Sequence, residues 1–251
     1  MTEQVGRVVV GIDGSEQSQA ALRWAAEHAA RTGAVLRIVH AVVLPVMGGL
    51  AWQPEAALQA ERLVRALEDE GHLLVGRACG EARRQQPDLV VESAVVAGDP
   101  REVLLAQVDP TDLLVVGSRG RGPVRGLLLG SVSAAVARHA ACPVVVHRDP
   151  AAGAQGVLTC TEPAALALAR DFGAAHETVV LEVPDEDVDA LVAGARTREL
   201  LVVARRPHRH TPVFDHAVAV AEHAPCPVAV VPAVVLAVVP PVAGLTAVPA
   251  G

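Results

Sequence analysis

The chain has 251 residues, of which 51% are hydrophobic and 20% charged, so it can bury a core as one large domain or two small ones. Its formal net charge is −7 and only 2% of its residues are aromatic. This composition argues against nucleic acid as a partner, because neither a basic surface nor aromatic stacking platforms are available to bind it. Four scattered cysteines without a Cys-x-x-Cys pair predict buried thiols in a cytoplasmic protein.

Two further patterns bear on location. Residues 1–4 lack the basic and apolar regions of a signal peptide. The stretch from Ala224 to Gly251 carries no charge, but its six prolines would break a membrane-spanning helix. We therefore expect no contact with a membrane.

Short apolar runs alternate with helical patterns over the first 148 residues. Strands are predicted at Arg7–Ile12, Ala34–Val43, Val90–Val96, Leu113–Val116 and Cys142–Val146. Helices are predicted at Glu16–Arg31, Pro54–Arg84, Gly98–Gln107 and Val132–Ala140, with Ser15 capping the first and Ser131 or Ser133 near the start of the last. This alternation predicts an α/β fold with a doubly wound parallel five-stranded sheet, in which ligands bind beyond the carboxyl ends of the strands.

A glycine-rich loop between the fourth strand and the last of these helices is the most informative stretch. It runs from Gly117 to Ser131 and contains Arg119, Arg121 and Arg125 but no carboxylate. Glycines let backbone N–H groups approach a ligand, and a helix N-terminus adds unpaired donors and partial positive charge. The loop therefore predicts a phosphate site, although it is not a Walker A loop, since the chain contains no lysine.

The spacing Gly-x2-Gly-x9-Gly-Ser, carried by Gly117, Gly120, Gly130 and Ser131, closely resembles the ATP-binding signature of the universal stress protein family. Asp13 also falls where that family places an aspartate that contacts adenosine, and the likeness extends over residues 5–148. The resemblance implies the strand order 3-2-1-4-5, which makes the strands ending near Asp13 and Gly117 neighbours.

The predicted ligand is ATP, with or without Mg²⁺. We expect Asp13 to accept hydrogen bonds from ribose or adenine, although the same carboxylate would also suit an Asx-turn before the helix. The resemblance assigns an adenine contact to the backbone of Ala41. The complete predicted nucleotide site consists of Gly11, Asp13, Ala41, Val116, Gly117, Arg119, Gly120, Gly130, Ser131 and Val132.

The second half of the chain repeats parts of the first. Leu113–Val116 recurs as Leu200–Val203, and Cys142–Val146 recurs as Cys226–Val230. The repeat is about 80 residues long, so it lacks room for one strand and the long helix, and it has lost the glycines of the loop. We predict a nucleotide-binding domain at 1–149, a truncated and degenerate α/β repeat at 155–232, and an apolar proline-rich tail at 233–251.

Three functions remain open from the sequence. The first is a regulatory, stress-response module that binds an adenine nucleotide and acts on an unidentified protein partner. The second is a slow ATPase or nucleotidyl transferase on the same fold, and the third is an interaction protein with an empty site. The family resemblance also implies pairing of the two strands Cys142–Val146 and Cys226–Val230 as a pseudo-dimer within the chain, leaves a homodimer open, and does not separate ATP from AMP or a cyclic nucleotide.

Overall fold

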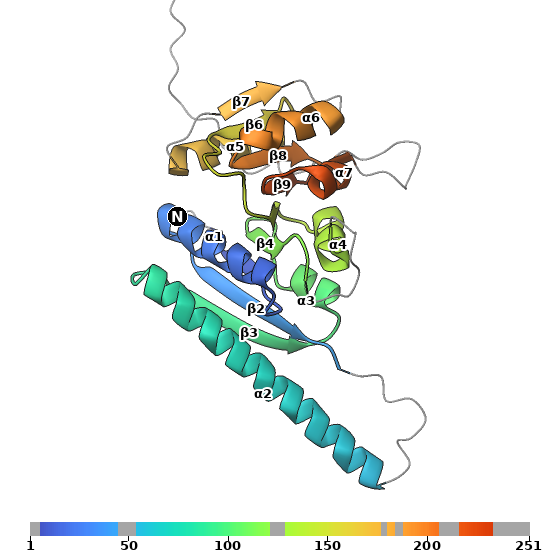
Figure 1. The fold of residues 1–251 in the computed structure, drawn as a ribbon. Coiled ribbons are helices and arrows are strands. Elements are labelled where there is room, and N and C mark those ends of the chain that lie inside the picture. Colours follow the sequence, from blue (N-terminus) through green and yellow to red (C-terminus); the bar gives the residue numbers. More distant parts are fainter. Residues whose placement is uncertain are drawn as a thin grey trace, which may run out of the picture.

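A computed structural model describes residues 6–44, 54–120, 129–176, 180–183, 188–205 and 216–232. Within these residues one nine-stranded sheet runs through both halves of the chain, in the order β3-β2-β1-β4-β5-β9-β8-β6-β7 (Figure 1). The strands are β1 (Val8–Gly11), β2 (Leu36–Val42), β3 (Val91–Ala97), β4 (Leu113–Gly117), β5 (Val144–His147), β6 (Val157–Cys160), β7 (Val180–Val183), β8 (Leu200–Ala204) and β9 (Val228–Val231). The helices are α1 (Glu16–Thr32), α2 (Pro54–Gln85), α3 (Pro100–Ala106), α4 (Ser131–His139), α5 (Pro163–His176), α6 (Val188–Gly194) and α7 (His216–His223), with a short 3₁₀ turn at Ala195–Thr197.

The first half has the predicted doubly wound architecture. Strands β3-β2-β1-β4-β5 are parallel throughout. Because side chains alternate across a strand, Val8 and Val10 pack into the core layer under α1 and α2, while Val9 packs into the layer under α3 and α4. A strand buried on both faces needs apolar residues at every position, which explains the unbroken valine runs of β1 and β5.

The second half repeats this topology with fewer elements. Its described strands have the order β9-β8-β6-β7, which corresponds to 5-4-1-2 of the first half. Helix α5 continues the layer of α1 and α2, whereas α6 and α7 continue the layer of α3 and α4. In the described residues no counterpart of β3 or of the long helix α2 follows β7, as the shortness of the repeat predicted. The predicted apolar tail lies outside the described residues.

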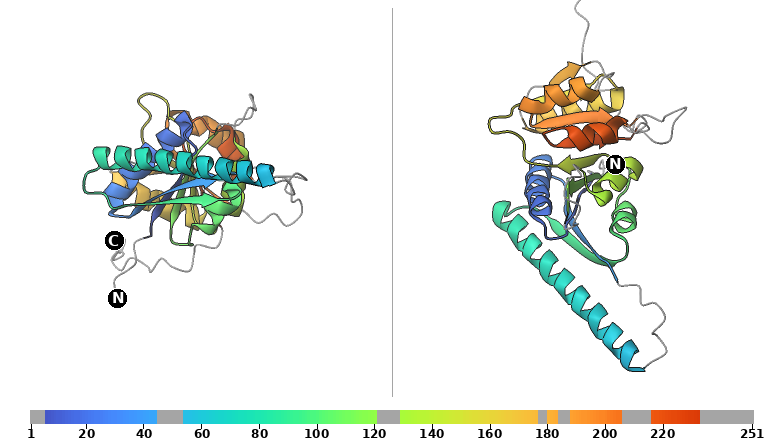
Figure 2. Two further views of the ribbon diagram at one scale, coloured as in Figure 1. Left: turned by 90° about the horizontal axis from the view of Figure 1, so that it is seen from below. Right: turned by 45° about the vertical axis from the view of Figure 1, so that its right-hand side comes forward.

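The two halves are joined edge to edge by β5 and β9. These strands pair antiparallel, with Val145 opposite Ala229 at the centre of the register. This is the pairing expected between the two repeated Cys-Pro-Val segments. Each half thereby covers the sheet edge that the other would expose (Figures 1 and 2).

Two arginines reinforce this joint by capping helices across it. Arg148, just after β5, donates to the carbonyl oxygens that end α7, including Ala224 O at 2.5 Å. Arg205, just after β8, donates to the carbonyls that end α4, including Ala140 O at 2.8 Å. The last carbonyls of a helix have no intrahelical partner, so a guanidinium both satisfies them and complements the negative end of the helix dipole.

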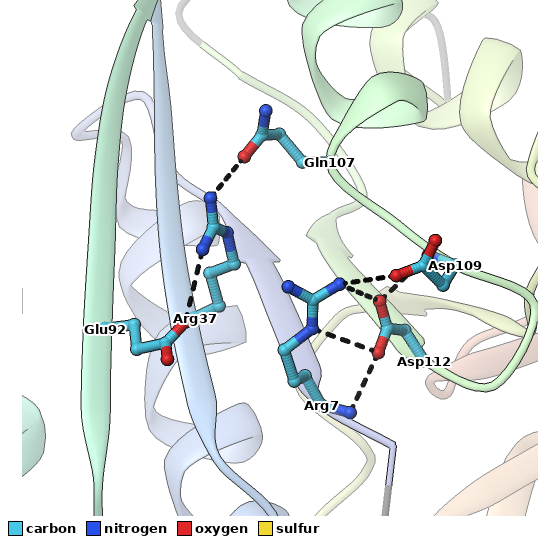
Figure 3. Close-up of polar contacts among 6 residues, drawn as sticks. All are labelled: Arg7, Arg37, Glu92, Gln107, Asp109 and Asp112. Atoms are coloured by element: carbon cyan, nitrogen blue, oxygen red, sulfur yellow. Dashed lines mark hydrogen bonds and ion pairs between the residues drawn. The ribbon is translucent and has the colours of Figure 1, made fainter. Parts of the chain in front are cut away.

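At the N-terminal ends of the first-half strands, hydrogen bonds and ion pairs between polar side chains connect neighbouring strands (Figure 3). Arg7 precedes β1, and its guanidinium lies 2.8 Å from the carboxylate of Asp112, which precedes β4. Asp112 is almost fully buried and also accepts hydrogen bonds from the backbone N–H groups of Arg7 and Asp109. Burial by itself raises the pKa of Asp112, but these hydrogen bonds outweigh it and the pKa is lowered. This network lies at the opposite end of the strands from the cavity described below.

Helix α2 crosses the sheet on the side of α1 and extends well past its edge (Figures 1 and 2). Gly71 lies where the helix meets β2 and β3. Glycine suits this position because a methyl group there would come within 3.1 Å of His40, Val42 and Val95. Of the helices in the described ranges, none combines the length and the apolar character that crossing a bilayer requires. The four cysteines are buried, as predicted, and burial raises the pKa of Cys142 and Cys226 to about 12.

Candidate functional site

A cavity of about 460 Å³ opens where β1 and β4 end, between these strands and helices α3 and α4. The structure brings all ten predicted site residues to its wall, namely Gly11, Asp13, Ala41, Val116, Gly117, Arg119, Gly120, Gly130, Ser131 and Val132. Eight further residues complete the described lining: Ile12, Ser18, Val39, Val43, Pro100, Leu104, Leu129 and Ser133. Strands β1 and β4 are hydrogen-bonded neighbours, so the chain reverses its winding direction at this cavity, which is where doubly wound sheets bind ligands.

Asp13 lies in the turn between β1 and α1. Its Oδ1 accepts hydrogen bonds from the backbone N–H of Ser15 at 3.0 Å and from the Ser15 hydroxyl at 2.6 Å. The Asx-turn expected for this carboxylate is therefore present, formed with Ser15. Because Ser15 holds Oδ1, the orientation of the carboxylate is set, and Oδ2 lies next to the Cα of Gly120 on the cavity side.

Two hydrogen bonds close the base of the glycine-rich loop. The N–H of Gly130 donates to the carbonyl oxygen of Ser118 at 2.8 Å, and the hydroxyl of Ser133 donates to the carbonyl oxygen of Gly117 at 2.7 Å. The Gly130 N–H is thus engaged within the protein, contrary to the expectation that it would be offered to a phosphate. Arg121 and Arg125, which the sequence placed in the same loop, lie outside the described residues.

Helix α4 begins at this cavity without a side-chain cap. Gly130 occupies the N-cap position with φ −73° and ψ 154°, so Ser131, which the sequence placed near the helix start, is the first helical residue, and no side chain caps the helix. By contrast, Ser15 caps α1 and Asp99 caps α3 through side-chain oxygens. Within the described chain, the first-turn N–H groups of α4, from Ser131 to Ser133, have no hydrogen-bond acceptor. An uncapped helix N-terminus facing a cavity is suited to an anion.

The glycines around the cavity allow close approach within the protein. A methyl group on Gly117 would lie 2.8 Å from the backbone carbonyl carbon of Gln17, in the first turn of α1. A methyl group on Gly120 would collide with the carboxylate of Asp13. These two glycines therefore let the loop contact the start of α1 and the Asp13 turn, a packing role that the sequence pattern does not reveal.

The side of the cavity away from the loop is apolar. Val39 and Leu104 are buried there, while Ala41, Val43 and Pro100 complete the wall between β2 and α3. The site thus has two chemically different parts: uncapped amides and Arg119 at one end, and an aliphatic surface at the other. A ligand that combines an anionic group with a flat apolar group matches this division.

Of the eight lining residues that sequence reasoning missed, two lie on α3. Pro100 and Leu104 follow β3, and no motif marks them. They reach the cavity only because the right-handed connection after β3 returns α3 across the sheet toward β4. Ser18 and Ser133 are also missed residues; the Ser18 hydroxyl donates to the nearby carbonyl oxygen of Ser15, and the Ser133 hydroxyl to that of Gly117 in β4.

Comparison with known proteins shows the family of the chain. The sequence model described as the universal stress protein family matches residues 4–148, which is more than half of the chain. The chain belongs to the universal stress protein family. A universal stress protein of Mycobacterium tuberculosis is 38% identical over 149 residues, covering 57% of this chain and 44% of the relative. One of Mycolicibacterium smegmatis is 34% identical over 145 residues, covering 56% of this chain and 45% of the relative.

The chain spans about half the length of the curated universal stress proteins that it matches. A solved structure extends the likeness in fold to both halves. A universal stress protein from Archaeoglobus fulgidus covers 92% of this chain and 100% of its own length with a TM-score of 0.60, at 16% identity. The present chain therefore shares with the Archaeoglobus fulgidus protein an α/β fold that continues beyond the region matched by the family model.

Proposed function

We propose that this universal stress protein is a regulatory module that binds one ATP molecule in the first half of the chain. The observation that carries the proposal is the uncapped N-terminus of α4 at the polar end of a 460 Å³ cavity. This volume lies within the range of small-molecule sites. Backbone amides that the fold leaves without acceptors are the groups that a phosphate chain needs.

Each part of the nucleotide has a counterpart in the cavity. The phosphates accept hydrogen bonds from the N–H groups of Ser131 to Ser133. The positive charge of Arg119 attracts them electrostatically. The ribose hydroxyls donate to Oδ2 of Asp13, which the Ser15 contacts hold in place. The adenine lies against the aliphatic wall formed by Val39, Ala41 and Leu104.

Mg²⁺ is part of the proposed ligand, held by the phosphates. Within the described residues, no group of three or more His, Cys, Asp or Glu side chains is arranged to hold a metal ion. ATP affinity should therefore be measured once with Mg²⁺ and once with a chelator. A difference between the two affinities would reflect Mg²⁺ bound to the phosphates of the nucleotide.

A pair of substitutions at Ser131 tests the amide contact. Proline is favoured at the first position of a helix, and the φ and ψ of Gly130 are compatible with a following proline. Ser131→Pro therefore removes one N–H donor from the cavity while α4 stays folded. Ser131→Ala is the matched control, because it removes the hydroxyl and keeps the N–H.

One charge-assisted hydrogen bond is worth about 1.5–3 kcal/mol, so Ser131→Pro should weaken ATP binding by roughly 10-fold or more. Ser131→Ala should weaken it by much less. Isothermal titration calorimetry measures both, and circular dichroism checks that each variant is folded. If the two variants bind ATP as well as the parent protein does, the proposed contact is wrong.

The identity of the nucleotide is tested directly. Protein purified without added nucleotide and then denatured should release adenylate near one equivalent per chain, and ATP should bind more tightly than AMP or cyclic AMP. Turnover of ATP to ADP that Ser131→Pro abolishes would favour the slow ATPase instead. Absence of binding for all three nucleotides would favour an interaction protein.

We propose further that the second half acts as a built-in partner of the first. The edge of β5 is already paired with β9, so this edge is closed to a second copy of the chain. The domain limits 1–149 and 155–232 remain predictions. Limited proteolysis tests them, with cleavage expected first in the connection between β5 and β6.

A further inference from the structure

A second hollow lies beside the first cavity, on the α1 side of the same sheet edge. It measures about 510 Å³ and is formed by the first turns of α1, by the residues after β4 and by the residues after β5. Arg119 lines both cavities. The two spaces thus flank the segment that leaves β4, with one guanidinium common to both.

Basic residues from three parts of the chain line this hollow. Arg23 comes from α1, Arg119 follows β4, and Arg148 follows β5. Arg23 and Arg119 are exposed, and neither has an ion-pair or hydrogen-bond partner within the described residues. Arg148 donates to the carbonyls that end α7 and so has a fixed position. Burial is the main cause that lowers the pKa of Arg148; Cys226 acts in the opposite direction, and the charge of Arg119 acts in the same direction as burial.

His147 adds a buried polar group to the same wall. The residue lines the hollow and is only 5% exposed, and its Nδ1 has no hydrogen-bond partner within the described residues. Burial lowers the pKa of His147 to about 4; the charge of Asp149 acts in the opposite direction, and those of Arg23 and Arg148 act in the same direction as burial. An unpartnered buried nitrogen costs free energy unless a ligand or water compensates it.

Two carboxylates, those of Glu16 and Asp149, also line the hollow, and both are exposed. Neither forms an ion pair with the three arginines in the described chain. Glu16 lies in the first turn of α1, where it complements the helix dipole. The formal charge of the lining side chains is therefore three positive against two negative, and the two most buried of its titratable side chains, His147 and Arg148, are the basic ones.

We propose that this second hollow binds a phosphate group, held by Arg23, Arg119 and Arg148 with His147 behind them. Its source is either free inorganic phosphate or the end of the phosphate chain of a nucleotide in the first cavity. The second source rests on the proposed ATP site, and the first does not. Arg119 lies where a phosphate chain passing from one cavity to the other would meet it.

Arg23→Gln is the decisive variant. Arg23 lines only the second hollow, is exposed and forms no hydrogen bond or ion pair within the described residues, so the variant should keep the fold. Arg77→Gln is the matched control, because Arg77 is an exposed arginine on α2, away from both cavities. Inorganic phosphate, AMP and ATP are each titrated into the full chain by calorimetry, and the ring ¹⁵N signals of His147 are followed by NMR.

We expect inorganic phosphate to shift the His147 signals and to bind Arg23→Gln about 3–10-fold more weakly than the parent protein or Arg77→Gln. If the site holds the end of a nucleotide, Arg23→Gln also lowers ATP affinity by this factor and leaves AMP affinity unchanged. If it holds free phosphate, AMP and phosphate bind together and Arg23→Gln changes neither AMP nor ATP affinity. The proposal is overturned if Arg23→Gln binds phosphate and ATP like the parent protein and the His147 signals do not move.

The ATP site can fail independently of this proposal. In that case Ser131→Pro and its alanine control bind ATP alike, while inorganic phosphate still binds in a manner that depends on Arg23.

Discussion

Lowering the pH from about 8 to about 5 should destabilise this protein through two histidines that the fold keeps neutral. His28 lies on α1 and contacts α5; its ring stacks on Trp24 with centroids 5.1 Å apart, and its Nδ1 is 2.9 Å from Nε2 of His176. Burial, followed by the charges of His176 and Arg31, lowers the pKa of His28 from 6.5 to about 4. His147 reaches about the same value, chiefly through burial.

The sign and size of the effect follow from proton linkage. A histidine whose pKa is lowered by folding binds its proton more readily in the unfolded chain. Stability is therefore full above a pH of about 6.5 and falls as the pH drops toward about 4. At pH 5, each of the two histidines should lower the free energy of unfolding by about 2 kcal/mol relative to pH 8, or by about 4 kcal/mol together. A typical total free energy of unfolding is about 5–15 kcal/mol.

Other groups modify this window in known directions. Burial lowers the pKa of His176, which adds to the loss, and raises the pKa of Asp171, which opposes it as the pH approaches the carboxylate range. Hydrogen bonds from Arg7 and the backbone lower the pKa of Asp112 against the opposing effect of burial, so its contribution is lost only at still lower pH. The interval from about pH 6.5 to 5 therefore reports mainly on the histidines.

Urea unfolding followed by circular dichroism measures the effect at several pH values. His28→Phe preserves an aromatic ring in the stack and cannot titrate, so it should remove about half of the loss between pH 8 and 5. His72→Gln, on the exposed face of α2, is the control and should leave the loss unchanged. A free energy of unfolding that changes by less than about 1 kcal/mol over this range, or an unaltered loss in His28→Phe, would refute the reasoning.

Three further predictions concern packing and the joint between the halves. Asp112→Asn should lower the free energy of unfolding by about 1–3 kcal/mol in urea, because an amide cannot accept every hydrogen bond that the carboxylate accepts, whereas the exposed Asp109→Asn should change it by less than about 0.5 kcal/mol. Equal effects would contradict the assignment. Gly117→Ala should lower the melting temperature, since its methyl group meets backbone and overpacking costs about 1–3 kcal/mol, while Gly80→Ala on the open side of α2 should raise it. Arg205→Gln should accelerate amide hydrogen exchange in β5 and β9, because the carbonyls that end α4 lose their donor; unchanged exchange would show that the strand pairing alone holds the halves together.

Much of the fold follows from local pattern. Short apolar runs predicted the strands of the first half to within a few residues, because central parallel strands such as β1 and β4 are covered on both faces and are mostly apolar. Ser15 is the cap of α1, as its place before the helical pattern indicated. The predicted site residues meet at one cavity because neighbouring parallel strands end at the same edge, although their role in binding a nucleotide stays a prediction.

Local pattern was insufficient where several segments compete for one group. The sequence placed Ser131 or Ser133 near the start of α4, but it did not show that Ser133 donates to Gly117 and that no side chain caps the helix. The sequence also treated the Gly130 N–H as a donor to a ligand, whereas it closes the loop on Ser118. In both cases the outcome depends on atoms more than ten residues away along the chain, which no local propensity includes.

The amino-acid sequence alone determined the order of strands and helices, the repeated and shortened second half, and the placing of glycines and Asp13 at strand ends. These features depend on periodicity, turn chemistry and repetition, which are properties of neighbouring residues. Only the tertiary structure decided that α4 is left uncapped, that Arg148 and Arg205 each cap a helix of the other half, and that Arg23, Arg119 and His147 line a second hollow. These features require segments far apart in the sequence to meet, and the packing of the whole sheet sets where they meet.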